Sequence, residues 1–219
     1  PITSIGGYIE TAQGDIPLKT KNEFLEKAIR QNNRMNSIID DLLRLSRIEA
    51  LEDEDAFNLS IQNLLPIIEG SVEDIRENIK KYSIKIDIKC SEDISAKVDS
   101  QLMREALINL VDNAIKYGHH GSEIVVRIST GRGVDQKFRP DLVRVQIINQ
   151  GDTIGEEHLS RLTERFYRVD KGRSRNMGGS GLGLAIVKHI VNRHRGRLGI
   201  TSNDCETCFS ITLPCVMRS

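Results

Sequence analysis

Apolar residues recur every three or four positions through the first fifty residues of the chain, which is the spacing of an amphipathic helix. One apolar stripe runs over residues 1–13, and Gly14–Pro17 interrupts it. A second stripe extends from Phe24 to Ile48 and is too long to be covered by one short partner helix. We therefore predict a helical hairpin that dimerises into a four-helix bundle, with packing against the rest of the chain as the alternative.

The rest of the chain alternates between strand-like and helix-like patterns. Strands are predicted where apolar and polar residues alternate, over 82–89, 123–130, 142–149, 197–202 and 207–213, with short extended pieces at 57–61 and 96–99. Helices are predicted over 64–81, 100–117, 156–165 and after Gly183, with Ser100 as a capping residue. This order predicts an α+β chain in which the hairpin precedes an α/β sandwich, with one sheet covered by helices on one face. An acidic stretch divides the chain into domains over residues 1–52 and 56–215.

Composition excludes several classes of partner. The 219 residues are 38% hydrophobic and 28% charged, as in an ordinary soluble globular protein. The formal net charge is zero, so nothing favours a nucleic acid or an anionic membrane. No apolar run approaches the length of about 20 residues that a membrane helix needs. Cys205 and Cys208 have metal-type spacing, but no second pair completes a site, and we interpret them as ordinary reduced thiols.

Glycines dominate residues 178–184, which read Gly-Gly-Ser-Gly-Leu-Gly-Leu and lead directly into an apolar run of helical spacing. Because glycine has no Cβ, the backbone N–H groups of such a segment can approach a polyanion closely. The start of the following helix adds unpaired donors and a partial positive charge. The stretch therefore predicts a phosphate cradle, with a plain loop or linker as the alternative.

A second polar cluster lies within the helix predicted from Ser100. Asn109, Asp112, Asn113 and Lys116 are spaced three to four residues apart and therefore share one face. Amide groups beside a lysine can hold a hydrated Mg²⁺ and neutralise phosphate charge. A solvated helix face is the alternative.

Five stretches in this order make the chain resemble a known family. They are Pro1–Tyr8, Ile39–Glu49, Asn109–Tyr117, Glu164–Asp170 and Gly179–Leu184. With them the chain is similar, over essentially its whole length, to the cytoplasmic core of a sensor histidine kinase. The resemblance implies a dimerisation and histidine-phosphotransfer hairpin, followed by an ATP-binding domain of the gyrase, heat-shock chaperone, histidine kinase and MutL (GHKL) type. Residues 158–198 look most like the alphaproteobacterial phosphate-regulon sensor kinases.

The resemblance also implies an activity and its partners. Such a kinase is an ATP-dependent enzyme of a two-component phosphorelay, and it passes the γ-phosphoryl group to a bundle histidine and then to a response-regulator aspartate. Residues 1–50 would form a homodimer and receive the receiver domain. The full protein would be bacterial and anchored in the inner membrane, with this part in the cytoplasm. The family's phosphoacceptor histidine stands five residues before the proline matching Pro1, and we interpret its absence here as truncation rather than natural loss.

The resemblance assigns site residues one by one. Asn113 would bind Mg²⁺, and Asn109, Asn113 and Lys116 would form the catalytic group. The residues assigned to cofactor binding are Asn109, Asn113, Lys116, Tyr117, Asn149, Gly151, Thr153, Ile154, Tyr167, Arg168, Gly179, Ser180, Gly181, Leu182, Gly183 and Leu184. Related hydrolytic ATPases carry a general-base glutamate at the position of Asn109. An amide cannot take a proton, which favours transfer to a protein over hydrolysis and argues against a plain ATPase.

The chain departs from the family in the adenine-binding box. Where the family has Asp-x-Gly-x-Gly-Ile, this chain has Asn149 and Thr153 in place of the aspartate and the second glycine. An amide oxygen accepts a hydrogen bond without charge assistance, which costs on the order of 1 kcal/mol in affinity. A dimerising scaffold without catalysis is therefore a second hypothesis. Phe166 is expected to be a lid anchor packed on the core, and Lys171, Arg173 and Arg175 would make the lid basic.

Overall fold

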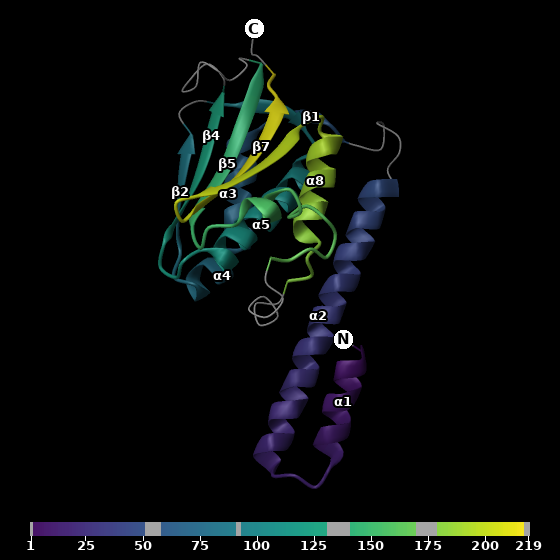
Figure 1. Cartoon of the computed structure of the whole chain (residues 1–219). Coiled ribbons are helices and arrows are strands. Elements are labelled where there is room, and N and C mark those ends of the chain that lie inside the picture. Colours follow the sequence, from purple (N-terminus) through teal and green to yellow (C-terminus); the bar gives the residue numbers. More distant parts are fainter. Residues whose placement is uncertain (1, 51–57, 91–92, 131–140, 170–178, 217–219) are drawn as a thin grey trace.

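A computed structural model describes residues 2–50, 58–90, 93–130, 141–169 and 179–216. It contains a helical hairpin and an α/β unit, and the second helix of the hairpin runs alongside the α/β unit (Figure 1). Among the helices described, none combines the length and the apolar composition that a membrane crossing requires.

The hairpin consists of α1 (Ile2–Gln13) and α2 (Leu18–Ala50), which lie antiparallel (Figure 1). The rings of Tyr8 and Phe24 are 6.1 Å apart between centroids, and Ala12 and Ala28 are buried. Small residues at these positions let the two helix backbones approach each other. The hairpin predicted from the apolar stripes is confirmed.

The apolar stripe of α2 has two environments. Leu45 and Ile48, near its C-terminal end, are 1% and 3% exposed and belong to the core of the α/β unit. Further from that end, Ile29 and Leu43 are 59% and 53% exposed in the single chain. Packing against the rest of the chain therefore covers only the last turns of the stripe.

The α/β unit is built on a five-stranded sheet with the order β2-β4-β5-β7-β6. The strands are β2 (Lys85–Cys90), β4 (Glu123–Thr130), β5 (Leu142–Gln150), β6 (Arg197–Asn203) and β7 (Glu206–Pro214). Only the β2–β4 pair is parallel among them. The buried alternate residues of β4, β5 and β7 face the helices α3 (Leu64–Asp74), α5 (Ser100–Tyr117) and α8 (Gly183–Arg193) (Figure 1). This arrangement confirms the predicted fold class.

Some predicted boundaries were wrong. The helix expected over 64–81 is divided into α3 and α4 (Arg76–Lys81) at Ile75, whose ψ of 17° leaves the helical region while its side chain stays buried. The helix expected over 156–165 ends as α6 (Glu156–Leu159) and continues as turns. The short strands β1 (Ser60–Asn63) and β3 (Ser95–Val98) pair in a separate sheet that the sequence did not predict.

Helix α5 is capped by Asp99 and not by Ser100. The Asp99 Oδ1 accepts from the backbone N–H groups of Gln101 and Leu102, both at 3.0 Å. Ser100 is already the first helical residue, so its side chain stands one position too late for this role.

The backbone of Asp99 is tied to the buried His194. The Asp99 N–H donates to His194 Nε2 at 3.0 Å, and Nδ1 lies 2.7 Å from the carbonyl oxygen of Ile190. This pattern suits a neutral ring that carries its proton on Nδ1. Burial lowers the pKa of His194 below its ordinary value.

Because the pKa of His194 is lowered in the folded state, the free energy of unfolding should decrease as the pH falls. Below the ordinary histidine pKa of about 6.5, the unfolded chain takes up a proton that the folded chain resists, so the stabilisation present above that pH is lost as the pH falls. The loss is at most about 1.4 kcal/mol for each pH unit. Urea unfolding at pH 7.5 and 5.5 measures it. A His194→Gln variant should lose less stability between these values, and equal losses in both proteins would contradict the role of His194.

Candidate functional site

The structure brings the face of α5 that carries Asn109 and Asn113 against the glycine segment, residues 179–184. A Cβ placed on Gly183 would lie 2.9 Å from Oδ1 of Asn109 and 3.9 Å from Nδ2 of Asn113. Helices α5 and α8 pack side by side, so the start of α8 lies beside these amides (Figure 1). The two polar motifs of the sequence thus lie next to each other in the structure.

The two asparagine amides have similar hydrogen bonds. Nδ2 of Asn109 donates to the carbonyl of Glu105 at 3.0 Å, and Nδ2 of Asn113 donates to the carbonyl of Asn109 at 2.8 Å. One N–H of each amide is used one helical turn back, and an amide nitrogen offers no lone pair to a metal, so the amide oxygens are the atoms that could bind a cation. Amide oxygens suit hard cations such as Mg²⁺. Within the described residues no cluster of three or more His, Cys, Asp or Glu residues offers another metal site.

The glycine segment forms a turn, called the glycine turn below, which a backbone hydrogen bond joins to Phe166. Gly181 has a φ of +78°, and its carbonyl accepts from the Phe166 N–H at 2.9 Å. A Cβ on Gly181 would lie 3.0 Å from the Cα of Phe166. Glycine is therefore required here by conformation and by space. Leu182 is fully buried, so only its backbone can meet a ligand.

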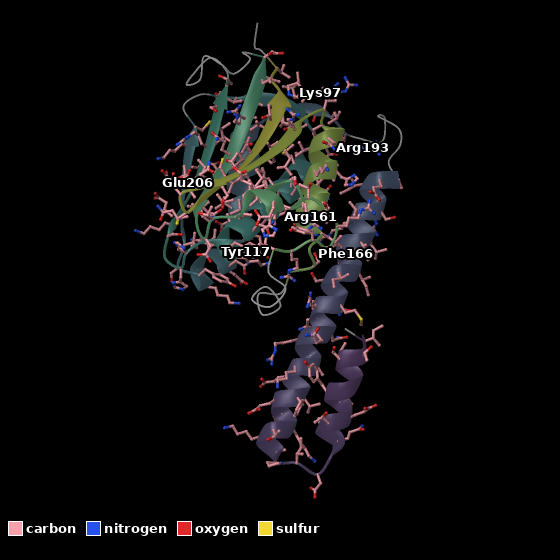
Figure 2. All side chains as sticks on the ribbon, in the orientation of Figure 1. Lys97, Tyr117, Arg161, Phe166, Arg193 and Glu206 are labelled. Carbon is pink, nitrogen blue, oxygen red and sulfur yellow. The ribbon has the colours of Figure 1, made fainter. Side chains whose placement is uncertain are left out.

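The prediction that Phe166 packs on the core is wrong. Phe166 is 53% exposed (Figure 2). Its own φ of 63° is in the left-handed region, and its contact with the glycine turn is made by the backbone. Gly178 and the predicted basic lid residues Lys171, Arg173 and Arg175 lie outside the described residues.

Tyr167 and Arg168 are both held by protein groups. The Tyr167 hydroxyl lies 2.6 Å from Nδ1 of His158, and the guanidinium of Arg161 lies 4.2 Å from the centroid of its ring. Arg168 donates to the carbonyl of Gly179 at 2.6 Å. Arg168 therefore braces the glycine turn, while Tyr167 is directed toward α6.

Lys116 forms an ion pair within its own helix. Its Nζ lies 2.5 Å from Oδ2 of Asp112, whose other oxygen accepts from Nδ2 of Asn78 at 3.2 Å. The positive charge of Lys116 is thus partly balanced in this structure. Tyr117, at the C-terminal end of α5, is 49% exposed (Figure 2).

Asn149 is a buried acceptor at the end of β5. It is 3% exposed, and its Oδ1 has no hydrogen-bond partner among the described residues. An unsatisfied buried acceptor costs about 1–3 kcal/mol. A ligand with an N–H donor, such as the amino group of adenine, would satisfy it, so this residue fits the predicted role.

The other residues of the adenine box have different surroundings. A Cβ on Gly151 would lie 2.6 Å from the carbonyl oxygen of Tyr117, so only glycine fits. Thr153 Oγ1 accepts from the N–H of Cys205 at 3.1 Å, which directs it to the β6–β7 turn. The Ile154 N–H donates to Ser202 Oγ at 3.0 Å. The sequence carried no signal for the roles of Cys205 and Ser202, because both bonds join distant segments.

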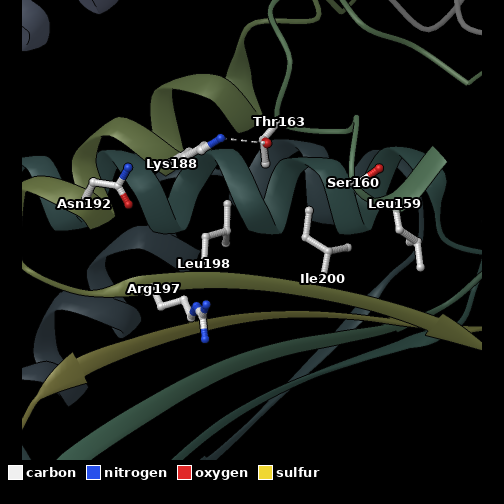
Figure 3. A pocket seen from close by; sticks show the side chains of 8 residues that line it. All are labelled: Leu159, Ser160, Thr163, Lys188, Asn192, Arg197, Leu198 and Ile200. Carbon is white, nitrogen blue, oxygen red and sulfur yellow. Dashed lines mark hydrogen bonds between the residues drawn. The ribbon is translucent and has the colours of Figure 1, made fainter. Parts of the chain in front are cut away.

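A cavity lies apart from this site, between α6, α8 and β6 (Figure 3). Lys188 and Thr163 approach each other at its rim, with 3.5 Å between Nζ and Oγ1. It contains none of the predicted site residues. Its lining residues are Leu159, Ser160, Thr163, Lys188, Asn192, Arg197, Leu198 and Ile200.

The chain matches two protein families. Residues 98–217 match the family described as histidine kinase-, DNA gyrase B- and HSP90-like ATPase. Residues 1–51 match the His kinase A (phospho-acceptor) domain. The order of the two matches agrees with the hairpin and the α/β unit of the structure.

Similar proteins include named sensor kinases. The phosphate regulon sensor protein PhoR of Pseudomonas aeruginosa is 34% identical over 205 residues, which is 92% of this chain and 44% of PhoR. The sensor histidine kinase CusS of Escherichia coli (strain K12) is 35% identical over 220 residues, covering 98% of this chain and 42% of CusS. The structure of histidine kinase ThkA in complex with the response regulator protein TrrA has a TM-score of 0.74 at 21% identity, covering 99% of this chain and 58% of that one. That likeness shows the fold.

The chain spans less than half the length of PhoR and CusS. Kinases with different names match at nearly the same identity, so the finer likeness to alphaproteobacterial phosphate-regulon kinases is not confirmed. The family match covers more than half of the chain. The chain therefore belongs to the histidine kinase-, DNA gyrase B- and HSP90-like ATPases, and its phospho-acceptor-type hairpin followed by the ATPase fold makes it a histidine kinase core.

Proposed function

We propose that this chain binds ATP with Mg²⁺ between α5 and the glycine turn and supports transfer of the γ-phosphoryl group to a histidine. The observation that carries the proposal is that the side chains of Asn109 and Asn113 lie next to Gly183, where a Cβ would be 2.9 Å from Oδ1 of Asn109 and 3.9 Å from Nδ2 of Asn113. This arrangement joins amide oxygens, the backbone N–H groups of a glycine turn and a helix N-terminus in one place. Phosphoryl transfer needs mainly positioning and charge neutralisation, which such a site supplies.

Each group of residues has a part in this proposal. The oxygen of Asn113 would hold Mg²⁺, which neutralises phosphate charge. The turn from Gly179 to Leu184 would donate backbone N–H groups to phosphate oxygens. Asn109 would orient the phosphate without acting as a base, which protects ATP from water. Lys116 would reach phosphate by leaving Asp112.

The nucleoside end of the ligand would lie at the adenine box. Asn149 would accept from the adenine amino group and Gly151 would let the ring approach the backbone. Tyr117 and Tyr167 would flank the nucleotide. For Tyr167 this requires release from His158.

The proposed partners are a second copy of the chain and a response regulator. The exposed residues Ile29 and Leu43 support a homodimer through residues 1–50. ThkA has been solved with a response regulator, which supports a receiver domain as the partner of the hairpin. The domain bounds 1–52 and 56–215, the cytoplasmic location, a membrane anchor elsewhere in the full protein and the phosphate-regulon assignment stay predictions.

Calorimetric titration with ATP, in Mg²⁺ and again in excess EDTA, tests the nucleotide site. We expect binding that weakens when the divalent ion is removed. Transfer of labelled phosphate from ATP to a His kinase A hairpin that carries a histidine tests the activity. An intact fold that binds no nucleotide at millimolar concentration would defeat the proposal.

A dimerising scaffold without catalysis is the second candidate function, and the uncharged Asn149 favours it. Asn149→Asp should tighten nucleotide binding about tenfold, because a charged acceptor forms the stronger hydrogen bond. Asn203→Asp, the same change at an exposed strand end, is the control. Binding that appears only in Asn149→Asp would support the scaffold. Equal affinities in Asn149→Asp and the wild type would show that the adenine amino group does not reach this position.

A further inference from the structure

The glycine turn contacts helix α2 of the hairpin. The Ser180 hydroxyl donates to Oδ2 of Asp41 at 2.5 Å, although 139 positions separate the two residues. The same hydroxyl oxygen accepts from the Leu182 N–H at 3.1 Å. Ser180 therefore joins the start of α8 to a carboxylate of α2.

The contact with Asp41 uses a donor that a phosphate would need, and a second donor is used within the turn. A serine hydroxyl has one proton, and that of Ser180 is given to Asp41. The Leu182 N–H is given to Ser180. The Asp41 carboxylate also places a negative charge next to the turn, where it would repel a polyphosphate. A triphosphate and Asp41 thus compete for the same turn.

The rest of α2 is docked by contacts that do not involve the turn. Leu45 and Ile48 are buried in the core of the α/β unit. The Glu49 carboxylate pairs with Arg165 and lies 3.2 Å from Nε2 of His189. Arg193 donates to the Glu49 carbonyl at 3.2 Å and lies on the side of the α/β unit that faces α2 (Figure 2). These contacts span the two turns of α2 that follow Asp41.

We propose that α2 is an inhibitory strap, in which Asp41 occupies the glycine turn and must leave before the nucleotide phosphates bind. The inference rests on the nucleotide site proposed above. Because coupling between two binding events is reciprocal, nucleotide lowers the affinity of α2 for the α/β unit as much as docking lowers the affinity for nucleotide. Nucleotide binding thus favours release of the α/β unit from α2.

The test measures the affinity of a non-hydrolysable ATP analogue with Mg²⁺ in four proteins of residues 1–219, the wild type and three variants. Asp41→Asn should bind about tenfold tighter than the wild type. Glu49→Gln loosens the docked helix away from the turn and should bind about fivefold tighter. Asp40→Asn, the same charge change on the exposed neighbouring residue, should bind like the wild type. X-ray scattering of the wild type should show a more extended particle when the analogue is saturating.

The outcomes separate the strap from the nucleotide site. Tighter binding in Asp41→Asn and Glu49→Gln, with the extended particle, supports the strap. Binding with the same Kd in Asp41→Asn and the wild type would overturn it and leave the nucleotide site standing. Tightening in Asp41→Asn alone would also overturn it, because docking elsewhere on α2 would then have no influence. Absence of binding in all four proteins, with normal thermal unfolding, would overturn the proposed function and the strap with it.

Discussion

Replacing Asn113 by alanine should weaken binding of ATP with Mg²⁺ by about 100-fold, the effect of losing one strong contact to a charged group. The amide oxygen of Asn113 is the atom proposed to bind the metal, because Mg²⁺ takes oxygen ligands, and Nδ2 donates to the carbonyl of Asn109. The side chain also lies beside Gly183 at the glycine turn. Alanine removes the proposed metal ligand without disturbing α5, since alanine is the best helix former. Calorimetric titration of the variant gives the affinity.

Three comparisons make the Asn113 result specific. In excess EDTA the variant and the wild type should bind ATP with similar affinity, because the missing contact acts through the metal. Asn192→Ala, which removes an exposed amide from α8, should keep the wild-type affinity. Thermal unfolding of Asn113→Ala should match that of the wild type. If Mg²⁺ tightens ATP binding by the same factor in Asn113→Ala and in the wild type, Asn113 is not the metal ligand.

Replacing Gly181 by alanine should weaken nucleotide binding at least tenfold. An L-residue in the left-handed region costs about 1–2 kcal/mol, and Gly181 has a φ of +78°. The added Cβ would also lie 3.0 Å from the Cα and 3.1 Å from the carbonyl carbon of Phe166. Both atoms are backbone, so the turn must move, and the Leu182 N–H and the start of α8 move with it.

Gly6→Ala provides the matched control for the Gly181 experiment. It adds the same methyl group within α1, where a Cβ on Gly6 meets nothing within 4 Å. It should leave nucleotide affinity unchanged and stabilise the helix by roughly 0.5–1 kcal/mol. The affinity and the midpoint of thermal unfolding are measured for both variants. Wild-type affinity in Gly181→Ala would show that the shape of this turn is not needed for binding.

The elements were predicted best where one periodicity runs without interruption. Alternation located β4 at residues 123–130, as the structure has it. Helix ends were predicted less well, because they depend on single backbone angles. Apolar spacing continues through Ile75 although the helix breaks there. The cap of α5 was assigned one residue late, since Asp99 and Ser100 are both good capping residues and adjacent.

The candidate site was predictable in its parts. Helical spacing of Asn109, Asn113 and Lys116 places them on one face wherever that helix lies. The resemblance to the kinase family joined this face to the glycine segment, which spacing by itself does not. The ion pair of Lys116 with Asp112 and the orphaned oxygen of Asn149 appear only in the structure, because each depends on side-chain orientation.

The sequence by itself determined the local features of this protein, which are the helical hairpin, the strands, the amide face and the glycine turn. Neighbouring residues produce these features through backbone angles and side-chain period, so they can be read along the chain. The tertiary structure decided how α5 meets α8 and which residues of α2 dock on the α/β unit. Asp41 and Glu49 have the sequence pattern of solvated charges, and their partners Ser180 and Arg165 lie 139 and 116 positions away. Such pairs form because the packing of two separate units brings them together, and this packing has no periodicity that a sequence can display.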